Sequence, residues 1–159
     1  IIPKHELQKN RMPKVVAQDI VAHITKPKPH IKLTATIDYE GKFCINTVMC
    51  FSAKSGLSNS FLLGIINSKF MSFYYYYFVF NQAIRTMHFM PGYADILPIH
   101  KTIDETTQKK IERMVDKILA VKKKDPKANM SELETKIDQM VYKLYDLTKE
   151  EIAIVETHV

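Results

Sequence analysis

The sequence FLLGIINSKFMSFYYYYFVF, residues 61–80, decides the fold. Its strongly polar residues are gathered at Asn67, Ser68 and Lys69, and the rest is apolar almost all the way round a helix. A helix of this kind is buried in a core rather than laid on a surface. Its length approaches that of a membrane span, but a lysine in the middle is costly at that depth. We therefore predict no membrane span but a buried helical core, formed by one helix or by two that break near Asn67 and Ser68.

A polar segment, NQAIRTMHFMPGYADILPI, follows at residues 81–99. It opens with Asn81 and Gln82 and then carries Arg85, Thr86 and His88. A rigid apolar helix followed by a polar, cationic loop can present side chains to a ligand. The same residues also fit an ordinary loop after a core helix, and composition alone does not separate the two interpretations.

Strand patterns precede the helical core. Residues 14–20 and 21–25 indicate a strand with a break, and residues 32–37 alternate polar and apolar positions. Residues 38–42 (DYEGK) have the composition of a turn, and residues 43–51 form the next apolar run. We predict that the runs on either side of this turn pair as an antiparallel hairpin.

Cys44 and Cys50 lie within one of these predicted strands. Six residues of extended chain separate them by about 20 Å, which is too far for a disulfide. No further Cys/His pair accompanies them, so the spacing does not predict a zinc site. We expect reduced cysteines in a cytoplasmic protein.

The last third of the chain has helical periodicity. Three pairs match the capping-box pattern, in which a Ser or Thr is followed three residues later by Glu: Thr102 with Glu105, Ser131 with Glu134, and Thr148 with Glu151. Apolar faces follow, and Asp125-Pro126 should end the first helix. The opposite face of that helix carries basic residues that should be solvated: Lys109, Lys110, Arg113 and Lys117. We predict an α+β fold in which a small, mainly antiparallel sheet packs on the buried helical core and a C-terminal helical hairpin follows.

Charge is distributed unevenly along the chain. The net charge is +6, and residues 1–101 hold 12 Lys/Arg against 5 Asp/Glu, whereas residues 131–159 hold 3 against 7. A basic globular region favours a polyanionic partner through phosphate contacts, although a basic solvated surface gives the same balance. Residue types suited to DNA occur in three stretches, and the candidate contacts are Lys26, Lys28, His30, Lys32, Lys54, Ser55, Asn81, Gln82, Arg85, Thr86 and His88.

Enzyme motifs are scarce. The chain contains no glycine-rich phosphate loop and no Asn/Asp-Pro-Pro-aromatic tetrad of the amino-group DNA methyltransferases. Glu40 and Lys42 match half of a metal-dependent nuclease site, with Asp19 upstream as a further carboxylate. The triplet lies on a predicted exposed turn, so we keep a nuclease only as a minor alternative.

Four segments carry a family resemblance: KVVAQDI at 14–20, YEGKFCIN at 39–46, LLGIINSKFMSFYYYY at 62–77 with ILPIH at 96–100, and VYKLYDLTKEEIAIVE at 141–156. Together they resemble the C-terminal target-recognition domain of type IIG restriction–modification enzymes and Taq-type adenine methyltransferases, which is similar to type I specificity subunits. INSK and LYDLTKEE are the more specific parts.

The resemblance implies sequence-specific recognition of double-stranded DNA by a domain that is not itself catalytic. Together with the residue patterns, it leads us to expect an incoming linker at 1–13, which lacks periodicity, a DNA target-recognition domain at 14–101 and a helical region at 102–159. S-adenosylmethionine and Mg²⁺ would bind only in methyltransferase or nuclease domains upstream in the same polypeptide, in keeping with a start at Ile1-Ile2-Pro3 without Met. The alternative is a helical module, residues 104–156, that docks a catalytic subunit.

Overall fold

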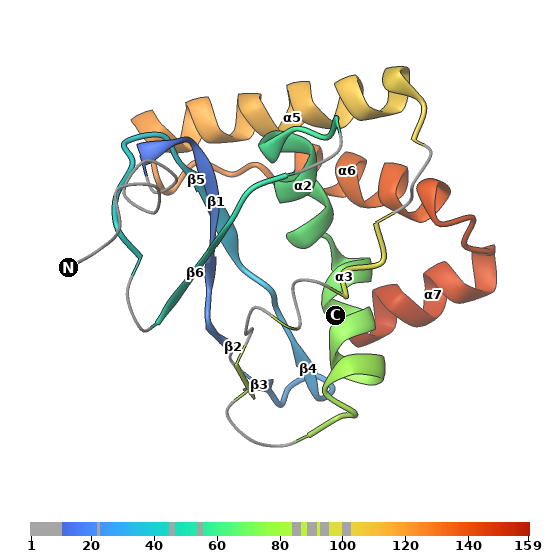
Figure 1. The fold of residues 1–159 in the computed structure, drawn as a ribbon. Helices are drawn as coiled ribbons and strands as arrows, with labels where there is room; N and C mark the ends of the chain where they lie inside the picture. Colours follow the sequence, from blue (N-terminus) through green and yellow to red (C-terminus); the bar gives the residue numbers. More distant parts are fainter. Residues whose placement is uncertain are drawn as a thin grey trace.

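The computed structural model describes residues 11–21, 23–44, 47–53, 56–83, 87–88, 92, 96–99 and 103–159. Its strands are β1 Lys14–Gln18, β2 Ile20–Val21, β3 His23–Ile24, β4 His30–Ile31, β5 Ala35–Asp38, β6 Val48–Phe51 and β7 Met87–His88. Its helices are α2 Asn59–Ile66, α3 Lys69–Tyr74, the π-helix η1 Tyr75–Val79, α5 Glu105–Lys124, α6 Ser131–Leu144 and α7 Lys149–His158. Small antiparallel sheets and a helical C-terminal region confirm the predicted α+β class (Figure 1). Among the described residues, no helix combines the length and apolar character needed to cross a bilayer.

The largest sheet has β1 at its centre, between β5 and β6, and both pairings are antiparallel. The predicted hairpin between the runs at 32–37 and 43–51 is therefore wrong, because both of these strands pair with β1 instead of with each other. Alternation reveals that a segment is a strand but does not select its partner. The central position suits β1, whose Val15 and Ala17 are almost completely buried.

The helical core breaks where the sequence predicts. Ser58 accepts a hydrogen bond from the Phe61 backbone N–H and begins α2, and Ser68 accepts from Met71 and begins α3. Between them, the Asn67 side chain makes two hydrogen bonds to the backbone of Ala35 on β5, at 2.8 and 3.0 Å. The INSK segment is thus a junction that ends one helix, starts the next and ties both to the sheet.

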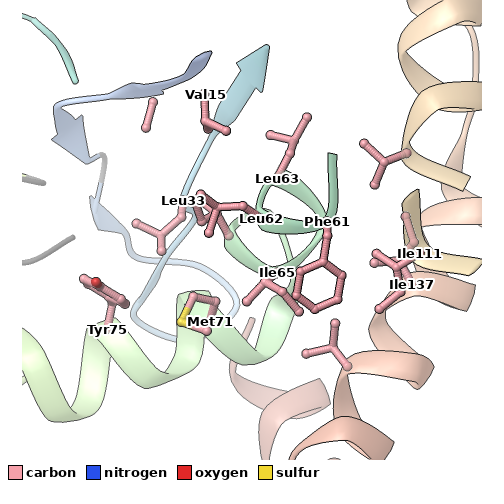
Figure 2. Packing of buried hydrophobic residues seen from close by; sticks show 14 of the residues in the cluster. Val15, Leu33, Phe61, Leu62, Leu63, Ile65, Met71, Tyr75, Ile111 and Ile137 are labelled. Carbon is pink, nitrogen blue, oxygen red and sulfur yellow. The ribbon is translucent and has the colours of Figure 1, made fainter. Parts of the chain in front are cut away.

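The apolar helix α2 is covered on both sides. Figure 2 shows Phe61 and Ile65 between residues of the sheet region, such as Val15, and residues of the C-terminal helices, Ile111 and Ile137. Gly64 permits a close approach of α5, because a Cβ at this position would lie 2.7 Å from Ile111 Cγ2. The hydrophobic cluster therefore includes residues from both the sheet region and the helical tail.

The C-terminal helices begin differently from the sequence prediction at two of three positions. Asp104, not Thr102, caps α5 by accepting from the Thr107 N–H, and Ser131 lies inside α6 without a side-chain cap at its start. The carboxylate of Asp104 thus provides the hydrogen-bond acceptor that the capping-box pattern assigned to the hydroxyl of Thr102. The third capping box, Thr148 with Glu151, is confirmed. Asp125 ends α5 as expected.

Polar contacts join α3 to the tail. The Asp138 carboxylate accepts from the backbone N–H of Lys69 at 2.9 Å, and burial raises the pKa of this carboxyl. Glu156 of α7 accepts from the ammonium group of Lys69 and from the Tyr142 hydroxyl. These contacts place α6 and α7 at the N-terminus of α3, where a carboxylate also meets the positive end of the helix.

The cysteines correct another expectation. Cys44 and Cys50 form a disulfide with a Cα–Cα distance of 6.4 Å, so the estimate of about 20 Å for extended chain is wrong. The strand β6 begins only at Val48, so the chain between the two cysteines is not extended throughout. The prediction that both cysteines are reduced is therefore also wrong.

Gly64→Ala tests the close approach of α2 and α5. Alanine is better than glycine by about 1 kcal/mol inside a helix, but overpacking costs about 1–3 kcal/mol. Because Ile111 is β-branched and stiff, its Cγ2 cannot swing away. We expect a net loss in the unfolding free energy, measured by urea denaturation.

Two further variants serve as controls. Gly92→Ala places its methyl where nothing lies within 4 Å and should leave stability nearly unchanged. Gly64→Ala with Ile111→Leu removes the obstructing Cγ2 and should recover part of the loss. Equal stability of Gly64→Ala and the parent chain would contradict this packing.

Asp38→Asn tests the cross-strand pair of Asp38 with Lys14, whose Nζ lies 2.6 Å from Asp38 Oδ2. This hydrogen bond, aided by the Glu40 and Lys42 backbone N–H groups, holds the pKa of Asp38 at about 2. A lowered carboxyl pKa adds stability that is complete above the unfolded value of about 3.9 and disappears as the pH falls through about 2. The Asn variant should therefore show a flatter decline of unfolding free energy between about pH 4 and 2. An identical decline in both proteins would show that the pair contributes nothing.

Candidate nucleic-acid interface

The first group of candidate contacts lies at the tip of the β3–β4 ladder. Lys26 and Lys28 are exposed in the connection, and the prolines beside them restrict its backbone. The His30 ring nitrogen Nδ1 lies 2.7 Å from the Lys28 carbonyl oxygen and helps to fix the loop. Lys32 is exposed just after β4. The predicted strand at 32–37 starts only at Ala35, so Lys32 lies in the connection between two strands.

This ladder is attached to the helical core. The Leu33 backbone N–H donates to the Ser72 hydroxyl of α3 at 3.1 Å, and Leu33 itself is buried. The rings of His23 and Tyr76 lie 5.9 Å apart, which joins β3 to η1. The basic tip is therefore carried by short strands that pack against a rigid helix.

The strand β7 brings the segment after the helical core back to the sheet region. Its His88 lies opposite Ile20 of β2, and its ring nitrogen Nδ1 is 2.7 Å from Asp19 Oδ2. Asp19 is 7% exposed, whereas the His88 side chain is half exposed. The buried carboxylate orients the ring, which remains accessible on its outer side.

The helical core ends in a left-handed turn. Asn81 and Gln82 have φ values of 49° and 56°, and both side chains are exposed. The Gln82 N–H donates to the Tyr76 carbonyl at 2.8 Å, and the Phe80 N–H donates to Tyr75. Asparagine adopts this conformation readily, but glutamine does so rarely. The turn points two amide side chains outward directly after the rigid helix.

The described candidates other than Lys32, which lines a cleft beside α5 and α6, come together at one end of the molecule. Figure 1 shows the β3–β4 ladder, the end of η1 and the region of β2 and β7 in the lower part of the view, away from α5. Four further candidates, Lys54, Ser55, Arg85 and Thr86, lie outside the described residues. Sequence reasoning found the residue types, and the fold supplies their proximity.

The minor nuclease alternative finds no common site for its three residues. Lys42 forms an exposed ion pair with Glu40 at 2.8 Å. Lys14, at the start of β1, pairs with Asp38 next to the turn that carries Glu40 and Lys42. Asp19 lies just beyond the other end of β1. Five residues of strand span about 16 Å, so Asp19 does not converge with the other two.

A cleft of about 580 Å³ was not anticipated from the sequence. It lies between residues 32–36, the end of α2, and the helices α5 and α6, and Lys32 is the one candidate contact that lines it. Its remaining polar lining includes Asn67 and Asp138, which already bond to the backbone of Ala35 and Lys69. The lining comes from four separate segments, so no local motif signals the cleft.

A comparison with models of protein families identifies the family of the chain. The family model of the TaqI-like C-terminal specificity domain matches residues 4–99, which is more than half of the chain. None of the curated proteins compared with the chain matches it. The matched range contains every candidate contact in the sheet region and in the loop after η1, while α5, α6 and α7 lie beyond it.

Gln82→Gly tests the left-handed turn. The left-handed conformation costs an ordinary residue about 1–2 kcal/mol, and glycine instead loses about 0.5–1 kcal/mol of backbone entropy. We therefore expect the unfolding free energy to rise by up to about 1 kcal/mol. The same substitution at Gln139, an exposed position inside α6, should lower it by about 1 kcal/mol. Equal losses in the two variants would contradict the φ of Gln82.

Proposed function

The chain belongs to the family of TaqI-like C-terminal specificity domains, and we propose that it recognises a specific sequence in double-stranded DNA for a restriction–modification enzyme. The observation that carries this proposal is the family match over residues 4–99, which includes the sheet, the helical core and all eleven candidate contacts. The gathering of the described candidates at one end of the fold supports it independently.

The β3–β4 tip has the chemistry of a phosphate contact. Lys26, Lys28 and Lys32 are exposed point charges, and none of them takes part in an ion pair with another described residue. Lysines of this kind bind phosphates with little dependence on sequence. In our proposal this tip, together with Lys54 and Ser55, fixes the position of the domain on the duplex.

The segment after η1 has the chemistry of base reading. Asn81 and Gln82 offer amides that pair with adenine, and Arg85 offers a guanidinium fork that pairs with guanine. Arg85 is the only arginine between Arg11 and Arg113. Thr86 and His88 complete the proposed set. The rigid helix before this segment favours a fixed orientation over a mobile one.

Catalysis is proposed to lie elsewhere in the same polypeptide. In this proposal a methyltransferase domain, and in a type IIG enzyme also an endonuclease domain, binds S-adenosylmethionine and Mg²⁺. This chain supplies the target choice and needs no cofactor of its own. The assembled enzyme would act on DNA in the cytoplasm.

The alternative of a helical docking module loses its main support. Docking through residues 104–156 would need an accessible apolar face, but Ile111, Val115, Ile137 and Val141 are buried against the rest of the core. That face stabilises the domain itself.

Two substitutions separate phosphate contacts from base contacts. Arg85→Ala should cost about 1–3 kcal/mol on a target selected from a random duplex library and little on random duplex. Lys28→Ala should weaken both complexes similarly and reduce the slope of log K against log salt by about one. Salt titrations of each variant on both duplexes measure these effects.

Lys149→Ala provides the control for charge, because this lysine is exposed on α7, outside the proposed surface. This substitution should leave the affinity for the selected target and the affinity for random duplex almost unchanged. If Arg85→Ala lowers both affinities equally, Arg85 is a phosphate contact only. A chain without any sequence preference in the library selection would refute the proposed function.

A further inference from the structure

The outer face of α5 carries a basic stripe, defined as Lys110, Arg113, Lys117 and Lys124. Their spacing of three, seven and fourteen residues from Lys110 returns to the same side of a helix. All four are exposed, whereas Ile111 and Val115 on the opposite side are buried against α2. The stripe extends about 21 Å along the helix axis at 1.5 Å per residue.

The acidic residues near the stripe are engaged elsewhere. Glu105 pairs with Lys109, while Glu112 and Asp116 accept hydrogen bonds from the hydroxyls of Ser58 and Ser60. Asp104 caps the helix, and Glu132 of α6 pairs with Lys136. The pKa of Asp104 is lowered mainly by the hydrogen bond from Thr107 and that of Glu132 mainly by the hydrogen bond from Lys136, and the positive charges of Lys110 and Lys117 add smaller contributions. Within the described part of the chain, however, no stripe residue forms an ion pair.

The helix does not benefit from this arrangement. Lys110 and Arg113 are three residues apart, and Arg113 and Lys117 are four apart, so each pair is a like-charge neighbour that destabilises a helix by about 0.2–0.5 kcal/mol. The helix dipole favours cations only in the last turn, which includes Lys124 but not the other three. Packing and helix stability therefore leave the three central cations unexplained.

The chemistry of the stripe fits a polyanion better than a protein partner. None of the exposed large hydrophobic residues in the described chain lies on α5, and protein interfaces usually centre on aromatic or apolar residues. Nucleic-acid interfaces are more polar and much more positive. Along one DNA strand the charges recur about every 3.4 Å of axis, so about 21 Å of helix can face several phosphates.

We propose that the basic stripe of α5 binds the phosphate backbone of a segment of duplex DNA other than the one read by the β3–β4 tip and the loop after η1. In Figure 1 α5 runs along the upper part of the view and the β3–β4 ladder lies in the lower part, so the stripe and the proposed reading surface belong to separate parts of the fold. The stripe also lies beyond the part of the chain matched by the specificity-domain family. The choice of DNA as the polyanion rests on the proposed function.

Lysine acetylation footprinting, read by mass spectrometry, tests both surfaces in one experiment on the whole chain. With random-sequence duplex at low salt, we expect loss of acetylation at Lys110, Lys117 and Lys124. Lys26 and Lys28 report on the reading surface in the same sample. Lys143 and Lys149, exposed on the acidic tail, should react as they do without DNA.

The outcomes distinguish the two proposals. Protection of Lys26 and Lys28 without protection of the stripe overturns only the second DNA surface. Protection of neither overturns this inference and the proposed function together. Protection of the stripe by poly-glutamate but not by duplex assigns it to an acidic protein and also overturns the inference.

Matched charge variants provide a second readout. The stripe variant Lys110→Gln, Arg113→Gln and Lys117→Gln should bind one short duplex per chain at low salt by sedimentation, whereas the parent chain binds two. The control variant Lys136→Gln, Lys143→Gln and Lys149→Gln has the same net charge and should still bind two. Lys110→Arg with Lys117→Arg keeps the charges and should also bind two. A stripe variant that binds two duplexes refutes the inference.

Discussion

The rest of the structure depends on the need to cover a helix that has no polar face. The side chains of Phe61, Leu62, Leu63, Ile65 and Ile66 in α2 are all buried, and so is Gly64 between them. The strands β1 and β5 cover one side, and α5 and α6 cover the other. The helical tail is therefore part of the core that supports the strands, even though the specificity-domain match ends before it. Burying apolar surface is the main favourable term in folding, and neither half of the chain can complete it alone.

The same constraint leaves the proposed DNA contacts outside the core. The β3–β4 tip, the left-handed turn at Asn81 and Gln82, and the half-exposed His88 all lie on short connections attached to buried elements. Each attachment is specific: Leu33 bonds Ser72, Asp19 orients His88, and the π-helix accepts the N–H of Gln82. Connections of this kind tolerate substitution better than the elements that carry them. A specificity domain can thus change its contacts without rebuilding its core.

Sequence reasoning succeeded where the signal is local. The apolar run, the break before Lys69 and the capping box at Thr148 depend on neighbouring residues, and the structure confirms all three. It failed where the answer depends on distant chain. Alternation at 32–37 and 43–51 could not reveal that β1 separates the two strands. Two local signals were also misread: the estimate for the cysteines assumed extended chain that the turn before β6 interrupts, and Asp104 rather than Thr102 caps the helix that starts at Glu105. For the candidate interface, residue types were accessible from sequence, whereas the proximity of His88 to Asp19 and the cleft beside α6 required the fold.

The central place of β1 in its sheet has a consequence for synthesis. Within this chain β1 precedes its partners β5 and β6, which follow in the next 37 positions, and the helices that cover α2 follow later still. Chains grow at about 5–20 residues per second, so the apolar segment 61–80 is made several seconds before α6 can cover it. During that interval the segment lacks the helices that cover it in the complete domain. Because α6 comes last among the elements that cover α2, its synthesis completes the burial of this apolar helix.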